Sequence, residues 1–179
     1  RCGVGKITVV DGDVISETNK NRQIIALSST EGLEKAETSA KRLRDINPDC
    51  EVTSVNLFYS AETKDEIDLS EYDYIADCID TVTSKLLLIA TAKELNKPII
   101  SSMGTGNRLD PSQITVTDIF KTSGDPLARI MRKELRARNV ESLKVVCSLE
   151  EPGKCCEGRN EITGRATPSS AVFVPATAG

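Results

Sequence analysis

Short apolar runs alternate with longer segments of helical periodicity along the chain. Apolar residues recur three and four positions apart in three stretches, which predicts helices from residue 28 to about 47, from 81 to about 96 and from 126 to about 138. Such alternation of strands and helices is typical of layered α/β proteins with a largely parallel sheet. The apolar runs that predict buried strands are 7–11, 52–57, 72–79, 98–102, 113–119 and 143–147.

Local polar residues define the ends of these elements. Ser28 and Glu31 have the spacing of a capping box, so we expect the first helix to begin there. It should end at Asn47, because a residue that precedes proline disfavours the helical conformation. Asp125 comes directly before Pro126 and is a favourable N-cap for the third helix. Residues 150–170 are rich in Gly, Pro and charged residues and are expected to form a mobile loop.

Composition excludes several classes of protein. The 179 residues contain no histidine, which removes histidine general bases and histidine metal ligands. The longest apolar run, residues 86–90, is too short to cross a bilayer. A net charge of -4 and an aromatic content of 3% argue against nucleic-acid binding through bulk charge or through a platform of stacked bases. Nucleic-acid binding would therefore require a local basic patch.

The chain has six cysteines, and no two of them have the C-x-x-C spacing of a zinc site or a redox motif. The sequence shows no signal peptide, so we expect a cytoplasmic protein with free thiols. No role is assigned to Cys147, Cys155 or Cys156. Because the chain begins with Arg1 and ends in small apolar residues, we expect it to be cropped at both ends.

Several polar residues stand where an α/β protein binds nucleotides. Asp11 follows the first strand and would bond ribose hydroxyls there, although a turn aspartate is the simpler interpretation. Arg22 offers a fork of donors suited to phosphate, but a solvated polar loop has the same composition. Lys35 lies near a helix start, where a bound anion would offset its conflict with the helix dipole. Asp80 follows the third strand and suits either magnesium or an N-cap.

Taken in order, these residues resemble the core of the ThiF/MoeB/HesA proteins, the bacterial relatives of ubiquitin-activating enzymes. Further segments resemble the branch of that family that dehydrates threonylcarbamoyladenosine in tRNA. The segments that carry the resemblance are 10–13, 19–23, Lys35 and 77–80 for the family, and 102–111, 118–122, 126–135 and 173–175 for the branch.

The resemblance implies a three-layer, Rossmann-like α/β fold in which residues 1–179 form a single adenylating domain, usually a homodimer. It implies that ATP and Mg²⁺ are the cofactors and that Arg22, Lys35 and Asp80 carry catalysis. Asp11 would bind the ribose, and Asp80 would face the metal and the reacting phosphate. The residues implied around the triphosphate are Asn19, Arg22, Gln23 and Lys35.

Two departures from the family pattern matter. The glycine-rich phosphate loop and its strand are absent from the chain, so we expect residues 1–179 alone to bind ATP poorly. The paired C-x-x-C motifs of the sulfur-carrier activators are also absent, which favours the dehydratase branch.

The implied reaction is ATP-dependent adenylation of the threonylcarbamoyladenosine carboxylate in tRNA, followed by cyclising loss of water. One alternative is an adenylyltransferase for a ubiquitin-like sulfur carrier, and sulfur-transfer proteins are possible partners. Another alternative is a dinucleotide-binding oxidoreductase or a non-catalytic nucleotide-binding module. A thermal-shift comparison of ATP with NAD would separate these classes.

The third predicted helix has a basic face that suits tRNA phosphates, although a solvated face has the same pattern. An apolar stripe on the other side would pack on the core, and Glu134 would either pair with Arg138 or face a dimer partner. The basic residues are Arg129, Arg132, Lys133 and Arg136, and the apolar ones are Leu127, Ile130, Met131 and Leu135.

Overall fold

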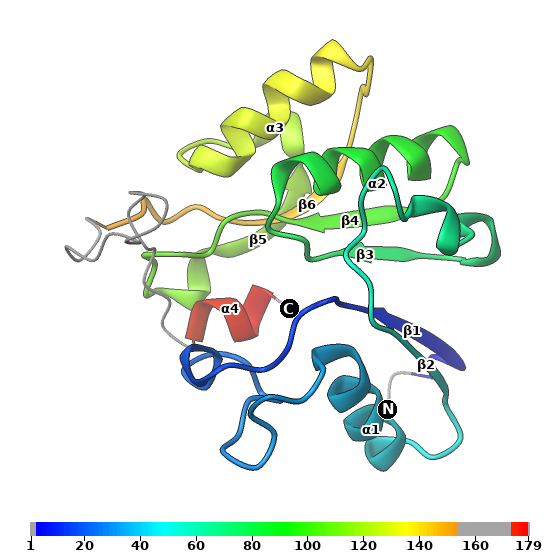
Figure 1. The fold of residues 1–179 in the computed structure, drawn as a ribbon. Helices are drawn as coiled ribbons and strands as arrows, with labels where there is room; N and C mark the ends of the chain where they lie inside the picture. Colours follow the sequence, from blue (N-terminus) through cyan, green and yellow to red (C-terminus); the bar gives the residue numbers. More distant parts are fainter. Residues whose placement is uncertain (1–2, 154–172, 179) are drawn as a thin grey trace. The chain divides into compact units, whose positions relative to one another are not determined.

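Strands β1 (Lys6–Val10) and β2 (Glu51–Val55) form a parallel pair in which Ile7 lies opposite Val52. The computed structural model describes residues 3–153 and 173–178, and after Ile67 it divides into two compact units (Figure 1). In the first unit, helix α1 (Lys35–Ile46) connects the two strands and packs against them. Its small core consists of Ala40, Cys50 and Val52, with Ile7, Val9 and Leu43 packed around them.

The second unit contains a four-stranded sheet in the order β3-β4-β6-β5. Strands β3 (Ile75–Asp77), β4 (Ile99–Ser102) and β6 (Lys144–Ser148) are parallel, and β5 (Ile114–Asp118) is antiparallel to β6. The carboxyl ends of the three parallel strands therefore share one edge of the sheet. At this edge the chain continues from Asp77 into residues 78–81, from Ser102 into residues 103–110 and from Ser148 into residues 149–153.

Helices cover the sheet of the second unit. Helix α2 (Val82–Glu94) connects β3 to β4, α3 (Pro126–Ala137) precedes β6, and the two helices contact each other above one face (Figure 1). Helix α4 (Phe173–Ala178) contacts β5. The described chain also contains short 3-10 turns. They lie at Glu17–Asn19 and Lys64–Glu66 in the first unit and at Leu69–Glu71, Pro111–Gln113 and Ile119–Lys121 in the second.

The predicted α/β class with mostly parallel strands is confirmed. The predicted start of the first helix is wrong, because α1 begins at Lys35 and residues 28–32 form turns. The Thr30 hydroxyl donates to the carbonyl of Ile25 at 2.7 Å and accepts from the amide of Leu27 at 2.9 Å, which closes a local turn in place of a helix. Gly32 then adopts a φ of 81°, a conformation that ends regular helix on either side of it.

The apolar side of α3 is centred on Ala128, Met131 and Leu135, each fully buried. Ile130 was expected on this side, but 46% of it is exposed, because a rotation of about 100° per residue places it beside the core face. The Asp125 cap is confirmed, since its carboxylate accepts the amide of Ala128 at 2.9 Å.

None of the helices in residues 3–153 and 173–178 is long and apolar enough to span a membrane. Of the loop expected over residues 150–170, only 150–153 belong to the described chain, and they contain no helix or strand. Cys155 and Cys156 lie outside the described residues. The single adenylating domain stays a prediction, because the two units are described separately.

Candidate functional site

The turn after β1 holds the first candidate, Asp11. Its carboxylate accepts the amide of Asp13 at 2.9 Å, and its own amide donates to the carbonyl of Val55 at 3.2 Å. The carboxylate is therefore fixed at the carboxyl end of the strand, where nucleotide-binding folds place an acid for ribose.

An exposed aromatic ring packs against this turn. A Cβ atom at Gly12 would lie 2.6 Å from the Phe58 ring, so only glycine permits the ring to approach this closely. Phe58 is 65% exposed, and its ring presents a flat apolar surface beside Gly12, the residue that follows Asp11. Sequence reasoning missed Phe58, because a single aromatic residue after a strand carries no distinctive spacing.

Lys35 is the first residue of α1 and is 9% exposed. Its ammonium lies 2.7 Å from the carboxylate of Asp13, which is 53% exposed in its side chain, and its amide donates to the Asp13 carbonyl at 3.0 Å. Asp13 therefore supplies the anion that this cation requires at a helix start. A phosphate that reached Lys35 would share or replace this carboxylate.

The segment with Asn19, Arg22 and Gln23 is a folded turn. The Asn19 carbonyl accepts the amides of Arg22 at 3.1 Å and Gln23 at 2.9 Å, and its side-chain oxygen accepts the amide of Ser16 at 3.1 Å. One guanidinium nitrogen of Arg22 donates to the carbonyl of Thr18 at 2.9 Å. The segment is therefore an ordered turn rather than irregular chain, and its mostly exposed residues are also compatible with the alternative of a solvated surface.

The side chain of Gln23 contains a buried oxygen atom that lacks a hydrogen-bond donor among the described residues. Its side-chain oxygen accepts no hydrogen bond from any described residue. An orphaned buried acceptor costs on the order of 1–3 kcal/mol, so a donor from outside the chain would stabilise this position. A nucleotide hydroxyl or amino group supplies such a donor.

Backbone pairing brings these candidates together in the first unit. The amide of Ile15 donates to the carbonyl of Leu33 at 2.8 Å, the amide of Gly32 donates to the carbonyl of Ile15 at 2.8 Å, and Val14 pairs with Glu34. The chain between Asp11 and the 19–23 turn is thereby held against the residues that precede Lys35.

Asp80 belongs to the second unit, at the carboxyl edge of its sheet. Its exposed carboxylate accepts the Thr81 hydroxyl at 3.3 Å. Thr81 is the N-cap of α2 and its side chain makes no capping bond, so the N-cap interpretation of Asp80 is wrong. The structure leaves the Asp80 carboxylate directed to solvent and open to a cation.

A buried polar cluster fixes the turn that carries Asp80. The Asp77 carboxylate accepts the Lys85 ammonium at 2.8 Å, the Ser101 hydroxyl at 2.5 Å and the Ile79 amide at 3.1 Å. The side chains of Asp77 and Lys85 are both fully buried. Sequence reasoning missed Lys85, and the only signal was a lysine within the apolar run of α2.

Arg108 joins three segments at the same edge of the sheet and is 2% exposed. Its guanidinium donates to the carbonyl of Glu150 at 2.9 Å, to the carboxylate of Asp125 at 3.3 Å and to the carbonyl of Gly104. The loop after β4, the start of α3 and the segment after β6 are thereby connected. Sequence reasoning also missed this residue, since its partner at Glu150 is distant in the chain.

Cys147 lies close to this cluster and is 1% exposed. Burial raises the pKa of its thiol, and the negative charge of Asp125 raises that pKa further. The thiolate is therefore disfavoured, and the structure gives Cys147 the properties of a core residue.

The basic face of α3 is largely exposed. Arg129, Lys133 and Arg136 lie in solvent, whereas Arg132 is half-buried and donates to the carbonyl of Thr122 at 2.9 Å and to its hydroxyl. The expected pair of Glu134 and Arg138 is present at 2.7 Å.

No cluster of three or more potential metal ligands occurs within residues 3–153 and 173–178. A metal bound at Asp80 would therefore complete its coordination with water or phosphate oxygens, which is the usual arrangement for Mg²⁺.

Comparison with known proteins places the chain in a family. The model of the ThiF family matches residues 1–148. A Bacillus subtilis protein named tRNA threonylcarbamoyladenosine dehydratase is 38% identical across 100% of this chain and 74% of its own length. The Escherichia coli protein of the same name is 43% identical over 76% of this chain, which spans about half (51%) of that relative.

Solved structures agree with this placement. The Escherichia coli dehydratase crystallised with AMP has a TM-score of 0.86 and 36% identity, and the match covers 98% of this chain and 72% of that one. The same dehydratase with ATP has a TM-score of 0.83 and 35% identity, over 98% and 71% of the two chains. Since the family model matches well over half of the sequence, the chain belongs to the ThiF family.

Proposed function

We propose that the protein containing this chain is an ATP-dependent dehydratase of threonylcarbamoyladenosine in tRNA. The observation that carries the proposal is the 38% identity across the whole chain to a relative of that name. The related structures with bound AMP and ATP support adenylation as the activating step.

The proposed reaction has two steps. An oxygen of the substrate carboxylate attacks the α-phosphorus of ATP, pyrophosphate leaves, and an acyl-adenylate forms. An internal nitrogen or oxygen of the same modified nucleoside then attacks the acyl carbon, closes a ring, loses its proton to solvent and releases AMP. The carboxylate oxygen departs on AMP, so the nucleoside loses the elements of water. Holding both reacting groups in one bound molecule contributes up to roughly 7–11 kcal/mol in favourable cases.

The first unit offers the groups that bind the nucleotide in this proposal. The Asp11 carboxylate accepts ribose hydroxyls, and the exposed face of Phe58 lies beside it for the adenine ring. The unsatisfied oxygen of Gln23 accepts a donor from the nucleotide. Arg22 and Lys35 stabilise charge on the phosphates, and Lys35 exchanges Asp13 for a phosphate oxygen. Asn19 holds the turn in place through its hydrogen bonds.

Asp80 fits a role in holding Mg²⁺, because one or two carboxylates together with phosphates are its common protein ligands. When bound, the metal would neutralise negative charge on the phosphates. The Asp77–Lys85–Ser101 cluster fixes the turn from which the Asp80 side chain extends. The homodimer, the sulfur-transfer partners and the cytoplasmic location remain predictions from the family resemblance.

Pyrophosphate release tests this proposal against its main alternative. The full protein would be incubated with ATP and, in parallel, with tRNA that carries threonylcarbamoyladenosine, with the same tRNA unmodified, and with a ubiquitin-like sulfur carrier. We expect one pyrophosphate and one AMP to be released for each modified nucleoside, and only in the incubation that contains the modified tRNA. Release that required the carrier protein would instead favour the adenylyltransferase.

A further inference from the structure

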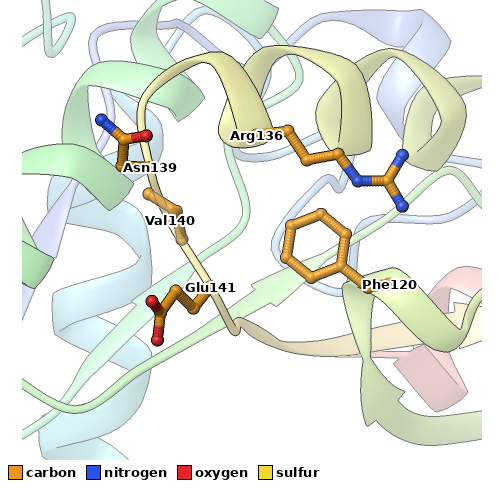
Figure 2. A pocket seen from close by; sticks show the side chains of 5 residues that line it. All are labelled: Phe120, Arg136, Asn139, Val140 and Glu141. Atoms are coloured by element: carbon orange, nitrogen blue, oxygen red, sulfur yellow. The ribbon is translucent and has the colours of Figure 1, made fainter.

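A hollow of about 400 Å³ lies at the carboxyl end of α3, away from the Asp125 cap. Phe120, Arg136, Asn139, Val140 and Glu141 line it. Figure 2 shows the Arg136 guanidinium lying over the Phe120 ring, with Asn139, Val140 and Glu141 across the hollow. The guanidinium carbon is 5.0 Å from the ring centroid, which is within the distance of a cation–π interaction.

Asn139, Val140 and Glu141 form the side of the hollow opposite Phe120, and the way in which α3 ends determines their positions. Asn139 adopts a φ of 57°, the left-handed conformation that terminates helices, and its amide donates to the carbonyl of Arg136 at 3.1 Å. The amide of Val140 then donates to the carbonyl of Leu135 at 3.0 Å, and Val140 is 8% exposed. The end of the helix thus fixes an apolar floor between two exposed polar side chains, Asn139 and Glu141.

These groups together match an unpaired nucleobase. Aromatic rings and guanidinium planes are the surfaces on which RNA-binding proteins stack extruded bases. The Asn139 amide both donates and accepts hydrogen bonds, whereas the Glu141 carboxylate only accepts them. The pocket therefore favours a base with amino or ring N–H donors, which adenine, guanine and cytosine present through their amino groups.

The exposed cations of α3 lead along the helix to this pocket. Arg129, Lys133 and Arg136 recur at i, i+4 and i+7, and α3 has 12 residues, which correspond to about 18 Å. Among the described residues none of these three forms an ion pair, while the acid of the helix, Glu134, is engaged by Arg138. A strand of phosphates that follows the helix would bring a base to its end.

We propose that this pocket binds an unpaired base of the tRNA substrate, stacked with the Arg136–Phe120 pair and hydrogen-bonded to Glu141. The inference rests on the proposed function, which makes RNA the substrate. The competing interpretation is that Arg136 packs on Phe120 for local stability and that the hollow holds only water.

Binding of modified tRNA to the full protein tests the proposal, with Phe120→Leu, Arg136→Lys and Glu141→Gln as variants. Loss of base stacking would weaken affinity about 5- to 100-fold in the first two variants. The slope of log affinity against log salt should stay unchanged in all three, because none loses a cation that contacts phosphate. Arg138→Lys, at the C-cap of the same helix, is the matched control, and its affinity should stay within about twofold of wild type because the charge is retained.

A fluorescent 2-aminopurine, placed in turn at each unpaired position near the modified nucleoside of the tRNA, would locate the base. We expect quenching at one position in the wild type and its loss in Phe120→Leu. If Phe120→Leu fails to fold, Arg136→Lys and Glu141→Gln, both at exposed side chains, decide the outcome.

Wild-type affinity of Arg136→Lys and Glu141→Gln, together with no quenched position, would overturn the inference. Activity of the wild type on the modified tRNA in the same samples shows whether the proposed function stands independently. If the wild type neither binds nor dehydrates that tRNA, the proposed function fails and the inference fails with it.

Discussion

Lys35 combines a structural contact with a proposed role at the phosphates. A buried cation at a helix start is unfavourable, and the half-exposed Asp13 carboxylate at 2.7 Å offsets that cost. Asp13 remains accessible to solvent, so in the proposed function a phosphate would replace it as the partner of the Lys35 ammonium. Arg22 is held differently, through the Thr18 carbonyl at 2.9 Å, which leaves other guanidinium donors for a ligand.

We predict that Lys35→Ala and Arg22→Ala each remove most of the adenylation activity of the full protein. Loss of one group that stabilises charge in the transition state costs roughly 3–4 kcal/mol of barrier. ATP–pyrophosphate exchange measures this effect. Lys20→Ala is the control, because Lys20 lies in the same segment but pairs with Glu31 at 2.7 Å. Exchange within a few-fold of wild type for either variant would show that the assigned role is wrong.

Lys85 is buried beneath the candidate site and has a different expected effect. Lys85→Met leaves the Asp77 carboxylate buried without its cation, which should destabilise the fold by about 3–5 kcal/mol. Urea denaturation measures the change. Lys85→Met combined with Asp77→Asn removes both charges and should recover part of the loss. Equal stability of the single and the double variant would contradict this account of the pair.

At the scale of elements, helix α3 connects the carboxyl edge of the sheet with the basic surface. Its buried side packs on the core, its start is capped by Asp125 and tied to Arg108, and its exposed side carries cations. Arg132 differs from the other cations because Thr122 already occupies one of its guanidinium nitrogens. We therefore assign phosphate contacts to Arg129 and Lys133 first.

Replacing Arg129 and Lys133 together by Gln should weaken tRNA binding and leave ATP affinity unchanged. Each lost phosphate contact lowers the slope of log affinity against log salt by roughly 0.9, so the double variant should be shallower by about 1–2 units. Anisotropy over a salt series measures the slope. If both the slope and the affinity were unchanged, this helix face would be an ordinary solvated surface that does not contact tRNA.

The sequence predicted elements well wherever local pattern determines them. Apart from the start of α1 and the whole of α4, the strands and helices lie within a few residues of their expected positions, and the Asp125 cap was found because capping depends on neighbours in the chain. The start of α1 was misplaced because the hydroxyl of Thr30 closes a turn instead. Helix α4 was not predicted, since its 6 residues include a proline and offer no periodicity.

The candidate site was predictable in part for the same physical reason. Asp11, Lys35 and Asp80 stand at strand and helix ends, so their chain positions made them candidates, and their roles stay predictions. Lys85, Arg108 and Phe58 acquire theirs through partners that folding brings close, such as Glu150 for Arg108. A single sequence without its fold does not contain those contacts.

At the scale of the whole molecule, burial of Cys147 links stability to pH. The folded-state pKa of this thiol is raised above its ordinary value of 9.0, chiefly by burial and further by Asp125. Below pH 9.0 the thiol is protonated in both the folded and the unfolded state, so ionisation of this group does not reduce the free energy of unfolding. As the pH rises beyond it, the unfolded chain ionises first, so stability falls until the folded-state pKa is passed.

We therefore predict that the free energy of unfolding declines above about pH 9 and that Cys147→Ala makes this decline less steep. Denaturant titrations of wild type and variant across that range measure the two slopes. Their difference, rather than the absolute stability, isolates the thiol, because the substitution also removes core volume. Parallel slopes would contradict the assignment.

The groups of the proposed function are distributed over both units of the molecule. In the proposed function the first unit would bind the nucleotide through Asp11, Arg22, Gln23 and Lys35, and the second carries Asp80, the basic helix and the proposed base pocket. The central claim is that these groups serve the transfer of AMP to a substrate carboxylate.

Transfer of heavy oxygen tests that claim most directly. Threonylcarbamoyladenosine labelled with heavy oxygen in its carboxylate would be placed in tRNA and incubated with the full protein and ATP, and the products would be weighed by mass spectrometry. The account predicts one labelled oxygen in AMP and a nucleoside lighter by one labelled water. Labelled oxygen in inorganic phosphate with formation of ADP, or dehydration that leaves AMP unlabelled, would contradict it.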